Sequence, residues 1–141
     1  MITEKEKQLT LESIEIALQE GAQHCRVNLS KSTTDLVDTL DGKIDKVSHC
    51  LDRGLTISLF VDGRFGSFST NRLEKEQLRS FIREAVAMTR LLAPDPCRRL
   101  PEPSRCCHTA LSGNELGLYD PSYCSLDASA RRDMALGAVL F

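Results

Sequence analysis

Apolar residues recur every three or four positions near the N-terminus, which is the spacing of one face of a helix. Thr3 followed by Glu6 fits a capping box, in which the threonine hydroxyl and the glutamate carboxylate each accept from the other residue's backbone N–H. Gly21 stands where a left-handed residue commonly ends a helix. We therefore predict an amphipathic first helix of about 17 residues. Its apolar face carries Leu11, Ile14, Ala17 and Leu18.

From Cys25 to Phe68 the spacing changes to two, which is typical of strands. Asp41-Gly42 separates two of the apolar runs. Asp-Gly is the strongest short hairpin signal, because both central residues of a type I′ turn need a positive φ. The segment predicts four or five antiparallel strands. Their apolar positions are Val27, Leu29, Leu36 to Leu40, Ile44 to Val47, Leu55, Ile57, Leu59 and Val61.

The stretch FVDGRFGSFSTN, residues 60–71, could be a phosphate-binding loop or the turn of a second hairpin. A phosphate loop needs glycines that lead into a helix at fixed offsets, with a Lys-Ser/Thr pair or GxGxxG spacing. Gly63 and Gly66 have only GxxG spacing, and no such pair follows. We interpret the stretch as a hairpin that turns at Asp62-Gly63.

Pairing across Asp62-Gly63 sets Phe60 opposite Phe65. Two aromatics are unusual on a sheet face that only meets water, so a second layer of this chain or a partner should cover them. Phe60 and Phe65 are therefore a candidate interface. The other predicted pairs are Val61 with Arg64, Leu59 with Gly66 and Ile57 with Phe68, and they leave Ile57, Leu59 and Phe68 on a core face.

A second helix should follow the sheet, capped by Thr70 or Asn71 with Glu74 nearby, and should end before Pro94. Its apolar stripe is Leu78, Phe81, Ile82, Ala85, Met88 and Leu92. Residues 94–105 are rich in proline and are predicted to be an extended linker. Asp127 or Ser129 could cap a third helix. That helix has hardly begun at the apolar end Val139-Leu140-Phe141, which is typical of a shortened chain.

These elements predict an α/β fold of the α+β type: a helix, four to five antiparallel strands and a helix, with both helices packed on one face of a curved sheet. We expect an N-terminal domain at residues 1–93, a linker at 94–105, and an irregular tail with the start of a third helix at 106–141.

Composition excludes several classes of function. The chain has 141 residues, a net charge of -2 and 41% hydrophobic residues, which is typical of a soluble globular domain. Its only basic cluster, Arg98, Arg99 and Arg105, lacks aromatic platforms for bases, so nucleic-acid binding is not predicted. No apolar run is long enough for a membrane span, and the charged N-terminus is unlike a signal peptide. We expect a cytoplasmic protein with reduced cysteines.

Three clusters invite a zinc site: His24-Cys25, His49-Cys50 and Cys106-Cys107-His108. Adjacent residues on a strand point to opposite faces, however, and CxxC or HxxxH spacing is absent, so reduced cysteines and surface histidines are favoured. Asp38 and Asp45 would face each other across the first hairpin, with Asp35 nearby. They could hold a cation, although a solvated edge is the more ordinary interpretation. No pattern indicates catalytic residues.

Several segments taken together resemble the N-terminal domain of the TldD/PmbA family, the metallopeptidases also called modulators of DNA gyrase. The resemblance covers about residues 5 to 125. It rests on DGK, on a strand pair of the form GxxxxxFVDGRxG, on STN and on LYDP. The segments are EGAQHCRVNL at 20–29, DGKIDKVSHCLDRGLTISLFVDGRFGSFSTNRL at 41–73, REAVAMTRLLAPDP at 83–96, LPEPS and LYDPSY.

The resemblance implies a cytoplasmic peptidase family whose members form homo- or heterodimers and process peptides or unfolded polypeptides. In such proteins an HExxxH helix and a distant cysteine hold zinc, with the glutamate as general base. Those residues belong to the C-terminal half, and none of them is carried over to this chain. We expect a non-catalytic domain, without a cofactor of its own, that supplies substrate-channel and dimer surface. The alternatives are a stand-alone interaction module that modulates a full-length partner, and a small metal-binding module.

Overall fold

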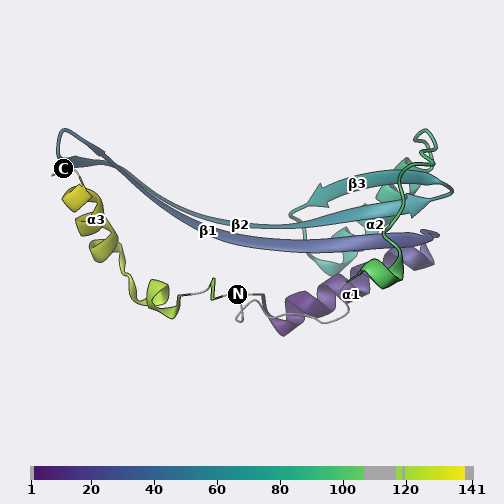
Figure 1. The fold of residues 1–141 in the computed structure, drawn as a ribbon, viewed down its shortest axis with the longest axis horizontal. Coiled ribbons are helices and arrows are strands. Elements are labelled where there is room, and N and C mark those ends of the chain that lie inside the picture. The colour runs from purple at the N-terminus through teal and green to yellow at the C-terminus, as the bar shows by residue number, and fades with distance from the viewer. Residues whose placement is uncertain (1, 107–116, 119, 139–141) are drawn as a thin grey trace. The chain divides into compact units, whose positions relative to one another are not determined.

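The computed structural model describes residues 2–106, 117, 118 and 120–138. Within these residues the fold is a three-stranded sheet in the order β1-β2-β3, with three α-helices and short 3-10 turns (Figure 1). No helix in the described ranges is both long and apolar enough to cross a bilayer. The elements are α1 (Glu4–Gln19), β1 (His24–Leu40), β2 (Lys43–Val61), β3 (Arg64–Thr70), α2 (Lys75–Thr89) and α3 (Ala128–Gly137).

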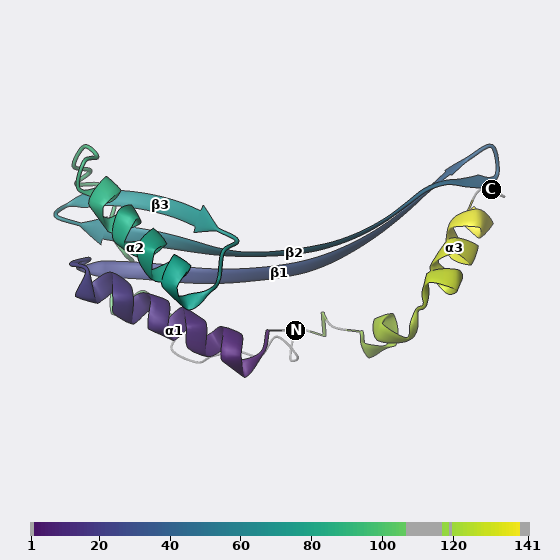
Figure 2. The same cartoon turned by 180° about the vertical axis from the view of Figure 1, so that it is seen from behind.

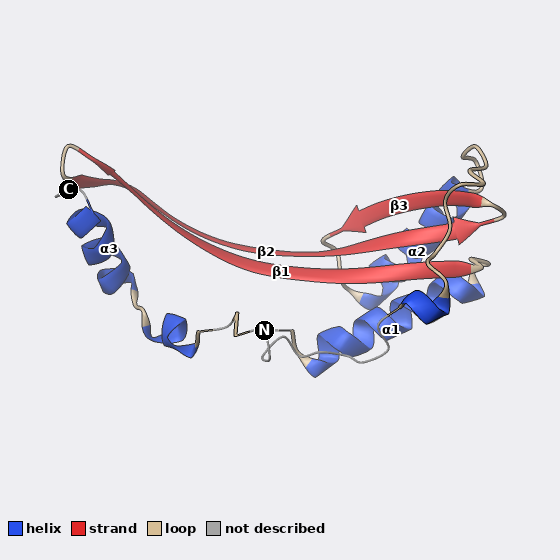
Figure 3. Cartoon of the chain, in the orientation of Figure 1, coloured by secondary structure: helices blue, strands red, loops and turns tan. Residues whose placement is uncertain are grey.

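The α+β class is confirmed, but the prediction of four to five strands is wrong. β1 has 17 residues and β2 has 19, so each takes up a region that the sequence seemed to divide (Figure 3). The mainly polar stretches 30–34 and 48–53 interrupt the apolar pattern without breaking the strands. A strand continues wherever a neighbouring strand pairs with its backbone, whatever its side chains.

The start and end of α1 agree with the prediction. The Thr3 hydroxyl accepts from Glu6 N–H at 3.2 Å, and the Thr3 N–H donates to Glu6 Oε2 at 2.8 Å, which completes the capping box. After 16 residues the helix ends, and Gly21 has a φ of 103°. A positive φ of this kind is easily reached only by glycine.

Both predicted hairpin turns are confirmed. Asp41 and Gly42 have φ values of 50° and 70°, and Asp62 and Gly63 have values of 51° and 72°. Two consecutive positive φ angles are the signature of a type I′ turn. The second turn fixes the predicted register: the pairs are Val61 with Arg64, Phe60 with Phe65, Leu59 with Gly66 and Ile57 with Phe68.

The core lies between the sheet and two helices. α1 and α2 cover the same face of the sheet, which is seen from the helix side in Figure 2. The alternating residues of β2 point into this layer and are fully buried, because period-two alternation places them all on one face. The buried apolar residues are Leu55, Ile57, Leu59 and Val61 of β2, Leu78, Ile82, Ala85 and Val86 of α2, and Ala17, Ala22 and Leu73.

The capping of α2 differs from the prediction. Glu74 is the N-cap residue, and its side chain makes no capping hydrogen bond. The Thr70 hydroxyl instead accepts from Arg72 N–H at 3.1 Å, two residues along the chain. A threonine hydroxyl can satisfy a local turn in this way, and the helix then starts later than expected. At α3, Asp127 is the cap, and its carboxylate accepts from Ala130 N–H at 2.8 Å.

The chain forms two compact units that share the long strands. One comprises Met1–Ser32 and Leu51–Pro101, and the other Thr33–Cys50 and Glu102–Phe141. The first unit holds the core described above. The predicted domain boundaries at residues 93 and 105 stay predictions. The predicted apolar end at 139–141 lies outside the described residues.

Candidate functional site

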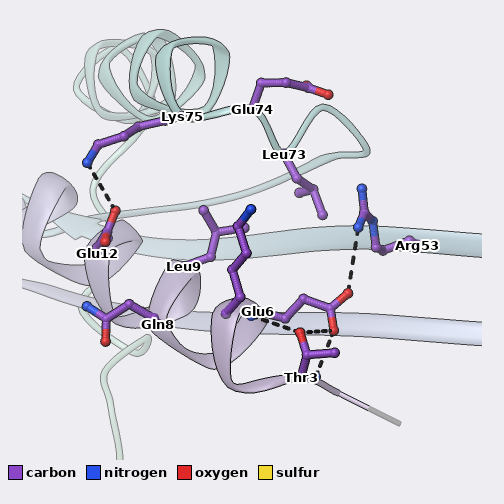
Figure 4. A pocket seen from close by; sticks show the side chains of 10 residues that line it. Thr3, Glu6, Gln8, Leu9, Glu12, Arg53, Leu73, Glu74 and Lys75 are labelled. Atoms are coloured by element: carbon purple, nitrogen blue, oxygen red, sulfur yellow. Dashed lines mark hydrogen bonds and ion pairs between the residues drawn. The ribbon is translucent and has the colours of Figure 1, made fainter.

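A pocket of about 550 Å³ opens in the first unit, a volume in the range of ligand-binding pockets. Its walls are the first turns of α1, β2 at Arg53 and the segment that leads into α2 (Figure 4). Leu9 and Leu73 supply its apolar surface, and charged side chains of both signs surround them. The lining residues are Thr3, Lys5, Glu6, Gln8, Leu9, Glu12, Arg53, Leu73, Glu74 and Lys75.

Glu6 provides a fixed negative charge at one side of this pocket. Hydrogen bonds from the backbone N–H and hydroxyl of Thr3, followed by the nearby Lys31 ammonium, lower the pKa of Glu6 to about 2. Glu6 Oε1 lies 3.5 Å from Lys31 Nζ and 3.6 Å from Arg53 Nη1. The Glu6 side chain is only 10% exposed, whereas that of Arg53 is 46% exposed. The carboxylate is therefore anchored inside, and the guanidinium stays accessible.

The opposite side of the pocket carries a second ion pair. Lys75 Nζ lies 3.5 Å from Glu12 Oε2, and the Lys75 side chain is largely exposed. Apolar surface between charged groups of both signs is suited to binding a chain segment that has an apolar side chain between polar groups. The lining contains no His, Cys or Ser that could act as a nucleophile.

Phe60 and Phe65 contact each other as the hairpin register requires. Their ring centroids are 5.1 Å apart and the rings are tilted by 58°, a favourable aromatic geometry. Arg98 covers Phe65, with its guanidinium carbon 4.7 Å from the ring centroid. A second layer from this chain thus covers part of the pair, and both rings are half-buried. Whether Phe60 and Phe65 also form an interface stays a prediction.

The segment after α2 folds back onto the second hairpin and so positions Arg98. Asp95 N–H donates to Gly63 C=O at 3.1 Å, and Arg64 Nε donates to Leu92 C=O at 2.8 Å. Asp95 Oδ2 lies 3.5 Å from Arg98 Nε, which orients the guanidinium. The proline content of residues 94–105 predicted an extended linker. The contacts with Gly63 and Arg64 could not be predicted, because they join distant residues and leave no periodic signal in the sequence.

Asp35 is the centre of a polar cluster in the second unit. Its Oδ1 lies 2.6 Å from His49 Nδ1, and its Oδ2 accepts from Arg131 at 2.6 Å and from the Tyr123 hydroxyl at 3.2 Å. Arg131 also lies over the Tyr123 ring, 5.2 Å from its centroid. The hydrogen bond from His49, with smaller contributions from Arg131 and Tyr123, lowers the pKa of Asp35. The cluster attaches the C-terminal residues of this unit to β1.

None of the sequence-based metal sites is assembled in the part of the chain that the structure describes. No group of three or more His, Cys, Asp or Glu side chains there could hold a metal ion. Asp35 contacts His49, Tyr123 and Arg131. Cys25 is half-buried, and burial raises the pKa of its thiol. Cys107 and His108 lie outside the described residues. The described members of these clusters are thus not brought together as a set of metal ligands.

Comparison with known proteins gives one family. A family model described as PmbA/TldA metallopeptidase domain 1 matches residues 25–89. The metalloprotease PmbA of Escherichia coli O157:H7 is 26% identical over 130 residues, which are 88% of this chain and 28% of that protein.

Two solved structures resemble the fold. A Bacteroides thetaiotaomicron protein, named as a candidate modulator of DNA gyrase, superposes with a TM-score of 0.81 and 36% identity. The match covers 97% of this chain and 30% of that one. TldE from Thermococcus kodakarensis has a TM-score of 0.61 and 20% identity over 81% of this chain and 26% of its own, and this likeness supports the fold alone. The chain spans less than a third of the length of these relatives.

Proposed function

This chain belongs to the PmbA/TldD family through its N-terminal domain, and from that premise we propose that it is the non-catalytic first domain of a zinc metallopeptidase that processes peptides. Its role would be to contribute substrate-channel and dimer surface. The zinc and the general base would belong to the part of the relatives that this chain does not match. The match of nearly the whole chain to 30% of a solved relative carries the proposal.

The pocket beside Glu6 supports a binding role for the domain. Its apolar surface and paired charges can contact a polypeptide segment. A substrate-channel wall has to bind peptides weakly and without sequence specificity. Charged groups that are already paired within the domain suit this role, because they contribute polar contacts without requiring one particular partner charge.

The isolated chain tests the non-catalytic part of the proposal. We expect the purified 141-residue chain to retain no stoichiometric zinc after dialysis and to hydrolyse no unfolded polypeptide. Metal content by atomic absorption and peptide release by mass spectrometry measure the two properties. Chelator-sensitive hydrolysis that co-purifies with this chain through two columns would contradict the proposal.

A second candidate function is an interaction module that binds and modulates a full-length family member without catalysis. The half-buried Phe60 and Phe65 pair favours it, because aromatic rings are common at the centres of protein interfaces. If this function is correct, Phe60→Ser should weaken an association that persists at high salt. Sedimentation of the wild type and the variant at 1 M salt measures this association, and an association that Phe60→Ser leaves unchanged would contradict this function.

A further inference from the structure

β3 has an open outer edge in the first compact unit. The sheet has the order β1-β2-β3, so β2 pairs with one side of β3, and no strand of the described residues lies on its other side (Figure 3). β3, the stretch of β2 that pairs with it and α2 all belong to this unit. An open edge presents backbone N–H and C=O groups with which another strand can pair.

The register of the hairpin determines which backbone groups face this edge. Beside a two-residue turn, the first pair of residues exchanges both of its backbone hydrogen bonds, and every second pair after it does the same. In β3 the members of these pairs are Arg64, Gly66, Phe68 and Thr70. The N–H and C=O groups of Phe65, Ser67 and Ser69 therefore point away from β2 and toward the open edge.

This edge lacks the features that commonly protect an edge strand, which are charged side chains, prolines and bulges. The stretch Phe65–Thr70 has no charged residue and no proline, and its pairing with β2 has no bulge. Two exposed serines carry small side chains that already contact β2. Ser67 Oγ lies 3.4 Å from Ser58 Oγ, and Ser69 Oγ lies 2.9 Å from Thr56 Oγ1. A strand beside the two serines would therefore meet neither a charge nor a bulky side chain.

A groove of about 390 Å³ lies between the end of β3 and α2. Phe81 gives the groove apolar surface, because its ring is half-buried and packs against the core. Successive side chains of a strand point to opposite faces, so every second side chain of a strand beside β3 would point toward α2 and could reach this groove. Some proteins bind extended peptides at a strand edge with pockets for alternate side chains. The groove is lined by Thr70, Arg72, Gln77, Ser80, Phe81 and Glu84.

Arg72 supplies an unpaired positive charge in this groove. Its backbone N–H donates to the Thr70 hydroxyl, but its guanidinium makes no hydrogen bond or ion pair with the residues that the structure describes. The carboxylate of the groove, Glu84, accepts from the Ser80 hydroxyl at 3.2 Å. A ligand with its own carboxylate would therefore complement Arg72, because hydrogen bonds between a guanidinium and a carboxylate are strong.

We propose that β3 binds an extended peptide as a fourth strand of the sheet. The peptide runs antiparallel to β3, which is the more stable direction, and exchanges hydrogen bonds with Ser67 and Ser69. It places an apolar side chain on Phe81 and an acidic side chain at Arg72. Because Arg72 follows the C-terminal end of β3, the acidic residue stands on the N-terminal side of the apolar one. The inference rests on the peptide-contacting part of the proposed function and names the strand that makes the contact.

A second copy of β3 fits this edge less well than a peptide does. β3 contains no acidic residue, so a second β3 would bring no carboxylate of its own to Arg72. Asp62, in the turn before β3, already contacts Arg90 and Gln23. A peptide can supply the missing carboxylate without breaking these contacts.

N-methylation of a peptide tests the strand pairing on the unaltered chain. The probe is a fluorescent peptide of alternating threonine and valine, with one glutamate near its N-terminus and both ends blocked. In a paired strand only every second N–H faces the neighbouring strand. N-methyl groups at one set of alternate positions should weaken binding by roughly tenfold or more, and at the other set by much less. Fluorescence anisotropy measures the affinities, and equal effects of the two sets would overturn the proposal.

Ser67→Pro tests whether β3 is the strand that binds. Proline removes an N–H that points to the edge and is not used by β2, so the fold should persist, which circular dichroism verifies. We expect roughly tenfold weaker binding of the probe. Ser67→Thr is the matched control, because it keeps the N–H and should bind like the wild type. Equal affinities of a folded Ser67→Pro and Ser67→Thr would rule out β3 as the site.

Arg72→Gln tests the charge. It should weaken binding of the glutamate probe by roughly threefold or more and leave a probe with glutamine in its place unchanged. Arg79→Gln, an exposed change on α2 outside the groove, should alter neither affinity. If the two arginine variants behave alike, the acidic residue of the proposal is wrong.

The outcomes separate this site from the proposed function. Peptide binding that neither N-methylation nor Ser67→Pro affects would overturn the β3 site and leave a peptide-contacting domain intact. A chain that binds no peptide would overturn both. Self-association that Ser67→Pro abolishes, in a chain that binds no peptide, would assign the edge to a second copy and overturn the peptide.

Discussion

Gly66 shows how one missing methyl group sets the distance between α2 and the sheet. A Cβ at this position would lie 2.5 Å from Thr89 Oγ1 and 2.6 Å from Phe68 Cε2, both far inside contact distance. The Thr89 hydroxyl cannot easily move away, because it donates to Ala85 C=O at 2.7 Å within a buried turn of α2. Close approach of helix and strand, and not a special φ, is what requires glycine here.

Gly66→Ala is therefore expected to lower the free energy of unfolding by about 1–3 kcal/mol, the usual cost of overpacking a core. Urea denaturation followed by circular dichroism measures it. Gly54→Ala is the matched control in the same sheet, because a Cβ there would meet only ordinary contacts at 3.7 Å and beyond. Equal losses for both variants would mean that the contact at Thr89 is not the cause.

Glu6 predicts a specific dependence of stability on pH. Its pKa falls from 4.5 to about 2 on folding, so its ionised form stabilises the folded state. That contribution is complete above pH 4.5 and is lost as the pH falls from 4.5 to 2. Glu6→Gln should thus be less stable than the wild type at pH 7, and the difference should shrink toward pH 2.

Glu15→Gln, an exposed substitution on the same helix, serves as the control. Its difference from the wild type should be small at every pH. Urea midpoints at pH 7, 4 and 2.5 for the three proteins give the comparison. A Glu6→Gln difference that stays constant across this range would show that the carboxylate gains nothing from its partners in the folded state.

The two positive-φ turns and the capping box could be read from the sequence, because the residues involved are neighbours and their chemistry admits few conformations. The Asp35 cluster could not. Asp35 and Tyr123 are 88 positions apart, and a local pattern carries no information on such a contact. Arg98 over Phe65 was missed for the same reason, although the need to cover the two rings was predicted from their register.

Among the elements, the two sheet-covering helices start in different ways. Thr3 caps α1 with its hydroxyl, whereas Glu74 at α2 makes no side-chain cap. Glu74→Asp supplies a carboxylate of the preferred length and should raise the free energy of unfolding by about 0.5–1 kcal/mol. Thr3→Ala should lower it by about 1 kcal/mol. Differential scanning calorimetry measures the stability of both variants. If Glu74→Asp leaves the stability unchanged, the backbone N–H groups at the start of α2 already have hydrogen-bond partners.

The third helix depends on Asp35 for its attachment to β1. Arg131 of α3 and Tyr123 in the preceding turn both bind this carboxylate. Asp35→Ala should therefore speed amide hydrogen exchange in residues 120–138 by tenfold or more, and leave the buried residues of β2 unchanged. Asp38→Ala, an exposed change on the same strand, is the control. Equal exchange in both variants would mean that the cluster does not attach α3.

Element lengths were the part of the fold that the sequence predicted least well. The runs around Ser30 and His49 lack alternation, and four to five strands were predicted where three exist, two of them long. Apolar alternation reports which residues face a core. It says little where a ribbon extends beyond the core and its strands are maintained by backbone pairing alone.

At the scale of the whole molecule, the chain is a domain that resembles less than a third of each relative. Its described residues supply a pocket and an aromatic pair, and no group of three or more His, Cys, Asp or Glu among them could hold a metal ion. These features agree with the proposed role of a domain that acts by contact with other polypeptides.

A hybrid protein tests this account most directly. The matched 28% of PmbA from Escherichia coli O157:H7 would be replaced by this chain, and chelator-sensitive hydrolysis of an unfolded polypeptide would be measured. The account predicts that the hybrid hydrolyses the polypeptide, and that PmbA without the replaced part does not. A hybrid that is folded by circular dichroism and as zinc-loaded as PmbA, yet inactive, would contradict it.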